Sequence, residues 1–333
     1  MSPPSESQAS NGQGGDPIRL GFIPLNDCAA LAVAREKGFF VAEGLDVTLS
    51  REPSWSNIRD KLAVGALDGA HMLAPMALAA SMGLGVYRTP MIAPLALNRN
   101  GSAFTVSEAL AEAMKTASLA QLVRRRAKEG WPPLRFAVVF PYSMHNYELR
   151  QWLSDGGVDP DNDVRLVVAP PPRMGGQLES GEIDGFCAGE PWNALAVARG
   201  TGTVAVRAID IWPNGPDKVL GVTRAWAESE PAQLLALIRA LVAAAAWADA
   251  SENRDELASL LAQPAYVGAP KAVIAASLAD IVFGRDGAGV PRLEHAEWFL
   301  EQMLRWGQID SKIDRAAAAA EVYRPDLFEA ATA

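Results

Sequence analysis

Apolar and polar positions along this chain switch between two periods, which predicts strands separated by amphipathic helices. Ile18–Ile23 is a short apolar strand, and apolar residues at helical spacing follow over Ala29–Phe40. Leu45–Ser50 alternates as a strand, and another apolar strand covers residues 69–74 after a helix that starts near Ser54. Strands that alternate with helices of this length predict a parallel or mixed sheet with helices on its faces.

The same order of elements occurs twice. Residues 20–69 and residues 137–185 both read strand, proline, helix, Gly-hydrophobic-Asp, helix, Asp-Gly, strand. The two Asp-Gly pairs are Asp68-Gly69 and Asp184-Gly185. An offset of roughly 115 positions is far longer than the 20–50 residues of a solenoid repeat. The repeat therefore indicates two similar α/β lobes, and two lobes that face each other form a cleft.

The length of 333 residues is typical of two domains. We expect a first lobe of residues 17–101 plus 203–333, which includes the C-terminal helices, and a second lobe of residues 102–202. The chain then crosses between the lobes twice, so that they hinge on two segments and can close on a ligand. Residues 1–16, rich in Ser, Gly, Pro and Gln, read as a disordered tail.

Composition narrows the location and the partners. A formal charge of −9 argues against direct nucleic-acid binding, which needs a clustered basic face. The apolar stretches at residues 69–87 and 240–248 are broken or too short to span a bilayer. No secretory signal is recognisable at the N-terminus. These features predict a soluble, cytoplasmic protein without a membrane segment.

The sequence offers no metal site and no familiar catalytic signature. Cys28 and Cys187 are lone cysteines in apolar settings, and His71, His145 and His295 lack ligand spacing. Nucleophile-elbow, Walker and dinucleotide-binding motifs are missing. We therefore expect binding rather than turnover, with no metal and no cofactor.

A ligand is expected at the loops that directly follow predicted strands, where helix N-termini point backbone N–H groups into the cleft. Four loops meet this condition: residues 24–27, 74–76, 141–145 and 189–192. They hold few charges, which favours a small ligand with little net charge. Asn26 or Asp27 is expected to cap the first helix.

Five positions are candidates for contact with the ligand, each with a structural alternative. His145, at a helix start, can donate to an anion, or it is a satisfied structural histidine. Lys218 begins a strand, and is either a ligand contact or an ordinary surface lysine. Trp55 is an apolar wall of the site or core packing. Gly189 and Glu190 either expose backbone donors at the cleft or form a surface turn.

Four long segments resemble the nitrate- and bicarbonate-binding receptors of bacterial ABC importers: residues 19–29, 55–62, 67–76 and 184–193. The likeness extends over roughly residues 18–325 and implies a periplasmic-binding-protein type II fold, with two α/β lobes around a ligand cleft. By position it implies an anion pocket made of Trp55, Ser102, His145, Gly189, Glu190 and Lys218. The importers tend to have glutamine where this chain has Ser102, and the shorter side chain leaves room for water. A lysine at 218 suits nitrate, because bicarbonate receptors place an acidic residue there.

Within that family the chain resembles the cytoplasmic nitrate/nitrite sensors of the NasS type. The resemblance implies an ANTAR-type antiterminator as partner, held inactive until nitrate or nitrite binds and then released for transcription of nitrate-assimilation genes. Two alternatives stay open. One is the receptor of a nitrate ABC importer, and the other is an enzyme like the thiamin-pyrimidine synthases, which needs a cofactor pocket and clustered histidines.

The resemblance also leads to a hypothesis for the site. Lys218 supplies charge, His145 and the Gly189 region supply directed donors, and Trp55 excludes water. Because a bound anion favours protonated histidine, nitrate affinity is expected to rise as the pH falls from about 8 to 6.

Overall fold

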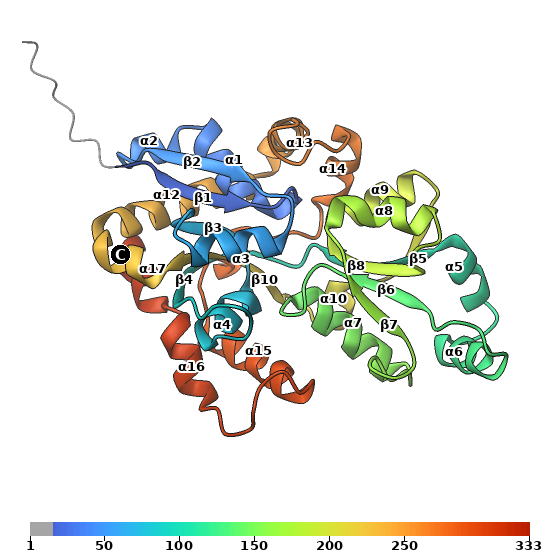
Figure 1. The fold of residues 1–333 in the computed structure, drawn as a ribbon. Helices are drawn as coiled ribbons and strands as arrows, with labels where there is room; N and C mark the ends of the chain where they lie inside the picture. Colours follow the sequence, from blue (N-terminus) through green and yellow to red (C-terminus); the bar gives the residue numbers. More distant parts are fainter. Residues whose placement is uncertain (1–15) are drawn as a thin grey trace, which may run out of the picture.

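The computed structural model describes residues 16–333, which form two α/β lobes side by side (Figure 1). The sheet of the first lobe has the order β2-β1-β3-β10-β4, and that of the second has the order β7-β6-β8-β5-β9. The predicted α/β fold with two lobes is confirmed. The predicted N-terminal tail lies, except for Asp16, outside the described residues.

The first lobe begins with β1 (Ile18–Phe22), η1 (Asn26–Cys28), α1 (Ala29–Glu36), α2 (Phe39–Ala42), β2 (Val47–Arg51), α3 (Trp55–Ala63), β3 (Gly69–Leu73), α4 (Ala74–Met82) and β4 (Met91–Arg99). The second lobe consists of β5 (Ser102–Ser107), α5 (Glu108–Met114), α6 (Leu119–Lys128), β6 (Arg135–Val138), α7 (Met144–Asp155), β7 (Arg165–Val168), α8 (Pro171–Glu179), β8 (Gly185–Gly189), α9 (Trp192–Ala198), β9 (Gly202–Arg207) and α10 (Ala208–Ile211).

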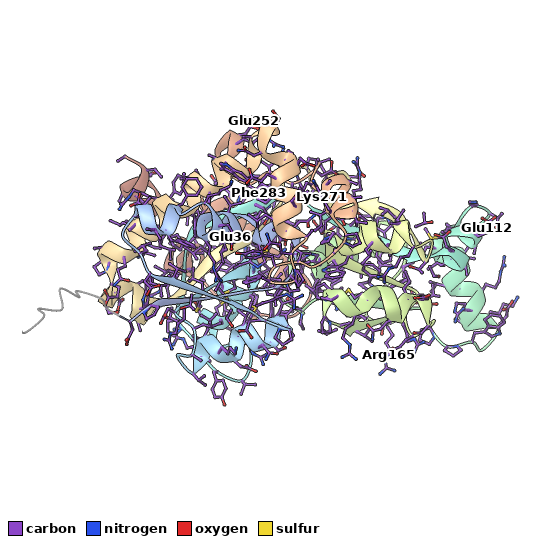
Figure 2. All side chains as sticks on the ribbon, turned by 90° about the horizontal axis from the view of Figure 1, so that it is seen from above. Glu36, Glu112, Arg165, Glu252, Lys271 and Phe283 are labelled. Carbon is purple, nitrogen blue, oxygen red and sulfur yellow. The ribbon has the colours of Figure 1, made fainter. Side chains whose placement is uncertain are left out.

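The chain then returns to the first lobe with β10 (Pro216–Thr223), α11 (Arg224–Ser229), α12 (Pro231–Asp249), η2 (Ser251–Asn253), α13 (Arg254–Leu261), α14 (Lys271–Ser277), η3 (Arg285–Gly287), α15 (Leu293–Arg305), α16 (Arg315–Val322) and α17 (Pro325–Thr332). α14, marked by Lys271 in Figure 2, contacts α9 of the second lobe. α12 is the one helix of residues 16–333 that is long and apolar enough to cross a membrane by length and composition. Half of its apolar window is buried in this fold, where α12 packs on α1, α2 and α17.

The repeat in the sequence is a repeat in the structure. In each sheet three parallel strands lie in the order second, first, third, which is β2-β1-β3 in one lobe and β7-β6-β8 in the other. An antiparallel strand from outside this three-strand unit follows, β10 in the first lobe and β5 in the second. The sheets are therefore matched strand for strand.

The repeated Asp-Gly pair joins the third strand of each lobe to the first. Asp68 Oδ2 accepts the backbone N–H of Arg19 at 2.8 Å, and Asp184 Oδ2 accepts that of Arg135 at 2.7 Å. The glycine that follows allows close strand packing. A Cβ on Gly185 would lie 2.8 Å from a backbone oxygen of β5. The motif is therefore a feature of the fold and carries no ligand chemistry.

The second crossing between lobes falls later than expected. Strand β9, predicted in the first lobe, pairs antiparallel with β5 of the second, and α10 packs against α7. The chain leaves the second lobe after residue 211 rather than near residue 202. The alternation over residues 203–207 predicts a strand but does not identify its partner.

Two Asn-Gly pairs form the crossings. Asn100 and Gly101 have φ angles of 59° and 89°, and Asn214 has a φ of 62°. The backbone N–H of Asn100 donates to the carbonyl of Gly215 at 3.0 Å, so the two crossing segments are joined to each other. Left-handed backbone conformations favour Asn and Gly, which explains why these residues occur at both points where the chain crosses between the lobes.

Gly101→Ala is expected to destabilise the protein by about 2–4 kcal/mol, because the left-handed φ is unfavourable and a Cβ would lie 2.6 Å from Ile281 Cγ1. Gly130→Ala is the matched control. Gly130 has a φ of 71°, but no atom lies within 4 Å of the position that a Cβ would take there. Urea unfolding measures both variants, and equal losses would show that the contact with Ile281 has no effect.

Candidate functional site

Lys218 lies at the centre of a buried group of polar side chains between the lobes. It is fully buried at the start of β10, opposite Leu73 of β3. Its Nζ pairs with Asp27 Oδ2 at 2.8 Å and also with the carboxylate of Asp217. Burial alone would lower the pKa of Lys218, but Asp217 and Asp27 outweigh it and raise the pKa. Lys218 is therefore a charged ammonium, and not a surface lysine.

An irregularity in β10 brings Asp217 beside Lys218. Neighbours on a regular strand point to opposite faces of the sheet. The pairing of β10 with β4 shifts register between Pro216 and Lys218 and again after Lys218. Lys218 N donates to the side-chain oxygen of Asn98 at 3.2 Å. A bulge of this kind re-aims a side chain, and here it places both charged groups on one side.

Asp27 connects the ammonium to His71. It lies in η1 directly after β1, and His71 Nε2 approaches Asp27 Oδ1 to 2.7 Å without hydrogen-bond alignment. Burial would raise the pKa of Asp27, but Lys218 and His71 lower it far below its ordinary value. The predicted capping role is wrong, because Cys28 is the N-cap of α1 and no side chain caps that helix.

Trp55 forms one wall of the site. Ser54 caps α3 by accepting the backbone N–H of Asn57, which fixes Trp55 as the first residue of the helix. The indole lies 5.8 Å, ring centroid to Nζ, from Lys218 and 5.5 Å from the ring of His71. Its Nε1–H is buried and has no hydrogen-bond partner. Trp55 therefore offers both an apolar face and an unused donor.

His145 approaches from the second lobe, as the second residue of α7, whose N-cap is Ser143. Its Nε2 lies 3.9 Å from Asp217 Oδ2, and neither ring nitrogen has a hydrogen-bond partner. Burial lowers the pKa of His145 to about 4, although Asp217 opposes the shift. At neutral pH the imidazole is uncharged, and one of its nitrogens can donate.

Ser102 and Glu148 form a second pair in the same lobe. Ser102 Oγ donates to Glu148 Oε2 at 2.8 Å, and both side chains are buried. Burial, and then the nearby charge of Asp217, raise the pKa of Glu148 to about 8. This carboxyl group is therefore mostly protonated at pH 7 and adds little negative charge to the site.

Gly189 and Glu190 lie where the lobes meet, but they differ in their relation to Lys218. A Cβ on Gly189 would lie 3.3 Å from Asp27 Oδ2, so a small residue lets the lobes approach. The Glu190 carboxylate accepts the backbone N–H of Ala194 at 3.0 Å, within α9, and burial raises its pKa to about 7. The structure thus gathers Trp55, Ser102, His145, Gly189 and Lys218 at one place, whereas the side chain of Glu190 is bound to the first turn of the following helix, α9.

Direct hydrogen bonds hold the lobes together around the site. Asn26 N donates to the carbonyl of Glu190 at 2.8 Å, and Trp192 Nε1 donates to the carbonyl of Pro24 at 3.0 Å. Tyr147 Oη donates to Gln308 Oε1 at 2.7 Å. Because Lys218 and His145 are fully buried, a ligand reaches them only when the lobes separate.

Trp192→Phe removes one of these bonds and retains most of the ring. If ligand binding is coupled to lobe closure, the variant is expected to bind its ligand about three- to tenfold more weakly, from the roughly 0.5–1.5 kcal/mol of one hydrogen bond. Calorimetry measures the affinity. Trp131→Phe, at an exposed tryptophan of the second lobe, is the control. An unchanged affinity in Trp192→Phe would show that this bond does not contribute to closure.

Four members of the site were missed as ligand-site residues: Asp27, His71, Glu148 and Asp217. The loops after strands hold few charges, and His71, Glu148 and Asp217 come instead from β3, α7 and β10. His71 gave a usable signal, because it is the one polar side chain of the fully buried strand β3. Asp217 gave none, since its position depends on the bulge.

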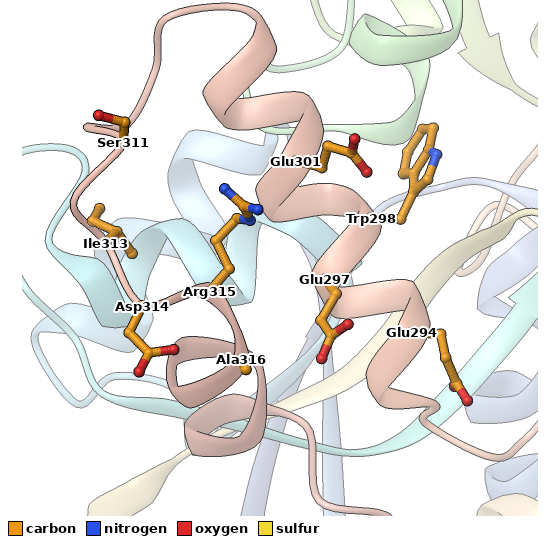
Figure 3. A pocket seen from close by; sticks show the side chains of 9 residues that line it. All are labelled: Glu294, Glu297, Trp298, Glu301, Ser311, Ile313, Asp314, Arg315 and Ala316. Atoms are coloured by element: carbon orange, nitrogen blue, oxygen red, sulfur yellow. The ribbon is translucent and has the colours of Figure 1, made fainter.

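A cavity of about 660 Å³ lies elsewhere, between α15 and residues 311–316 (Figure 3). Glu294, Glu297 and Glu301 of α15 line it. This acidic lining disfavours an anion. In the described part of the chain, no group of three or more His, Cys, Asp or Glu side chains is arranged to hold a metal ion.

Comparison with known proteins gives consistent matches. The NMT1-like family matches residues 12–262. The nitrate import ATP-binding protein NrtC of Synechocystis is 40% identical over 97% of this chain, and the chain spans about half of that protein, 51% of its length. The nitrate/nitrite binding protein NrtA of Synechococcus elongatus is 34% identical, with 94% of this chain and 77% of that protein covered. The crystal structure of the periplasmic nitrate-binding protein NrtA from Synechocystis superimposes with a TM-score of 0.90 at 30% identity, covering 95% of this chain and 88% of that one.

Proposed function

This chain belongs to the NMT1-like family, and we propose that it is a nitrate- and nitrite-binding sensor. It is similar over most of its length to nitrate-binding substrate-binding proteins of the NrtA type. The observation that carries the proposal is the buried ammonium of Lys218, with the unused donor of Trp55 beside it in the first lobe and that of His145 coming from the second. A positive charge and neutral donors that converge between two lobes suit a small oxyanion.

The proposed binding mode assigns a role to each side chain. Lys218 provides the charge, and His145 and Trp55 provide directed N–H donors. Ser102 and Glu148 form an uncharged polar pair at the second-lobe side, and Gly189 allows close approach of the lobes. The side chain of Glu190 is left out of direct contact, because it is engaged within α9.

The size of the ligand limits its affinity. Nitrate has four heavy atoms, and the best small ligands gain about 1.5 kcal/mol per atom, which gives roughly −6 kcal/mol, or a Kd in the tens of micromolar. Charge-assisted hydrogen bonds contribute about 1.5–3 kcal/mol each, so two or three of them account for the binding. Micromolar binding of this kind suits a sensor of nutrient supply.

We place the protein in the cytoplasm, with an ANTAR-type antiterminator as its partner. The match to one half of proteins named as ATP-binding components supports this location, since ATP is a cytoplasmic nucleotide. In this proposal the sensor sequesters the antiterminator and releases it when nitrate or nitrite closes the lobes. The acidic composition is consistent with control of RNA through a partner rather than by contact.

A receptor of a nitrate ABC importer is the second candidate, and the similarity to NrtA proteins favours it. Both functions use the same ligand site, but they differ in the protein that recognises the closed lobes. We propose binding rather than turnover in either case, because the matched proteins are named for binding and import.

Co-purification separates the two candidates. The sensor is expected to retain an antiterminator from cells grown without nitrate, and to release it when nitrate is added to the purified complex. An antiterminator that stays bound whether or not nitrate is added would contradict the sensor function. A membrane permease that co-purifies and is released in place of an antiterminator would contradict it too.

The pH dependence of nitrate affinity differs from the one expected of an ordinary histidine. The pKa of His145 is about 4, so protonation induced by a bound anion raises the affinity mainly below pH 6, and not between pH 8 and 6. Glu148, with a pKa of about 8, becomes charged as the pH rises and then repels the anion. Calorimetry is expected to show nearly constant affinity from pH 8 to 6, stronger binding below that range and weaker binding above it. A steep change between pH 8 and 6 would assign His145 a higher pKa.

A further inference from the structure

We propose that Asp217 acts as an internal anion that occupies the ligand's position on Lys218, and that the ligand binds by displacing it. The inference rests on the proposed function, since it concerns the same site. It makes Asp217 a residue that sets affinity and specificity, although it is not a member of the pocket that the resemblance implies.

The position of the Asp217 carboxylate supports this role. It contacts the ammonium of Lys218, and its Oδ2 lies 3.9 Å from Nε2 of His145, so it sits between the two groups proposed to bind the oxyanion. A carboxylate is a planar oxyanion of charge −1, as nitrate is. Asp217 therefore presents to Lys218 the same chemistry that the ligand would present.

The two aspartates on Lys218 differ in how their contacts are distributed. The Oδ1 atoms of both are buried without a hydrogen-bond partner, but the contacts of Asp217 with Lys218 and His145 both involve its Oδ2. Asp27 contacts Lys218 through one oxygen and His71 through the other, so it is anchored at both ends. Lys218 Nζ donates a hydrogen bond to Asp217, and an anion that replaces this bond frees Asp217 from Lys218, whereas Asp27 would still be in contact with His71.

Charge balance favours displacement over simple addition. Two buried carboxylates share the ammonium of Lys218, and His71 lies beside Asp27 rather than beside Asp217, while His145 is uncharged and Glu148 is mostly protonated at neutral pH. A further anion beside both aspartates would leave buried negative charge without a partner, which is strongly unfavourable. If Asp217 moves off Lys218 as the lobes open, the incoming anion replaces one charge by another.

The bulge in β10 is a second, independent observation. Regular alternation would point Asp217 away from the face that carries Lys218, and the shifted register between Pro216 and Lys218 turns it toward the ammonium. Bulges of this kind occur next to functional sites, where they direct a side chain.

The consequence is a threshold for binding. A ligand must interact with Lys218 and His145 better than the attached carboxylate does, so weakly bonding anions such as chloride are excluded and the affinity for the selected oxyanion is lowered.

Calorimetric titration of sodium nitrate into the purified full chain tests the proposal, using wild type, Asp217→Asn and Asp27→Asn. Each variant removes one negative charge next to Lys218 and keeps the shape of the side chain. Asp217→Asn is expected to bind nitrate about tenfold more tightly or better, because its neutral amide competes poorly for Lys218. Asp27→Asn is expected to show no gain, because Asp217 still occupies the ammonium.

The outcomes are distinguishable. Equal gains in affinity in both variants would indicate a general charge effect and overturn the proposal. No gain in Asp217→Asn would overturn it as well. In either case, nitrate binding by wild type would leave the proposed function intact. Absence of nitrate binding by wild type and by both variants would overturn the proposed function itself. If Asp217→Asn does not fold, wild-type crystals grown with nitrate decide the matter. The proposal requires the Asp217 carboxylate to have moved out of hydrogen-bond distance of Lys218 Nζ, and an unchanged pair with nitrate bound elsewhere would contradict it.

Discussion

Lys218→Ala is expected to weaken nitrate binding by about 100-fold or more. The substitution removes a charge-assisted bond worth about 1.5–3 kcal/mol and leaves Asp27 and Asp217 to repel the anion. It also leaves two buried carboxylates without their cation, so the free energy of unfolding is expected to fall by about 3–5 kcal/mol. Calorimetry gives the affinity, and a thermal melt at the same pH shows how much protein is folded.

Lys61→Ala is the matched control for this prediction. Lys61 also pairs with a buried carboxylate, that of Glu52, at 2.6 Å, but it lies partly exposed on α3 and makes no contact with Lys218. This variant is expected to retain nitrate binding. Folded Lys218→Ala that binds nitrate as wild type does would remove Lys218 from the ligand site.

Glu148→Gln is expected to stabilise the protein at pH 8 by several kcal/mol and to have little effect at pH 4.5. The pKa of Glu148 is about 8 in the folded protein and about 4.5 ordinarily, because burial disfavours its charged form. A raised pKa contributes stability that is fully present below the ordinary value and is lost as the pH rises through the folded value. At about 1.4 kcal/mol per pKa unit, the difference is on the order of 4 kcal/mol.

Urea unfolding at pH 4.5, 6 and 8 measures this effect. The amide keeps the shape of the carboxyl group and can still accept from Ser102 Oγ, so the comparison isolates the charge. Glu129→Gln, at an exposed position, is the control and is expected to show no such pH dependence. Equal stability of wild type and Glu148→Gln at all three pH values would mean that Glu148 ionises normally in the folded protein.

Much of the fold could be predicted because it depends on local signals. The strand–helix alternation and the repeated Asp-Gly pairs indicated two similar lobes, and the structure shows that Asp68 and Asp184 make the same backbone hydrogen bond in each. The second crossing could not be placed, because β9 reads as a strand whichever sheet it joins. Its partner, β5, is about 100 residues away in the chain.

The site was only partly predictable. The loops after strands that the sequence singled out contain His145 and Gly189, and the structure places both beside the buried group around Lys218, because the carboxyl ends of parallel strands lie along one edge of a sheet. Trp55, at the start of α3, lies outside these loops. Asp27 was read as a helix cap, since capping is what an aspartate before a helix usually does. Its actual partners, Lys218 and His71, are set by tertiary packing and by a strand that returns from the far end of the chain.

The most direct test of the central claim is a crystal structure of the full chain grown with sodium nitrate. We expect one planar anion between the lobes, within hydrogen-bond distance of Lys218 Nζ and of a ring nitrogen of His145. Nitrate bound at another place, with no anion next to Lys218, would contradict the account.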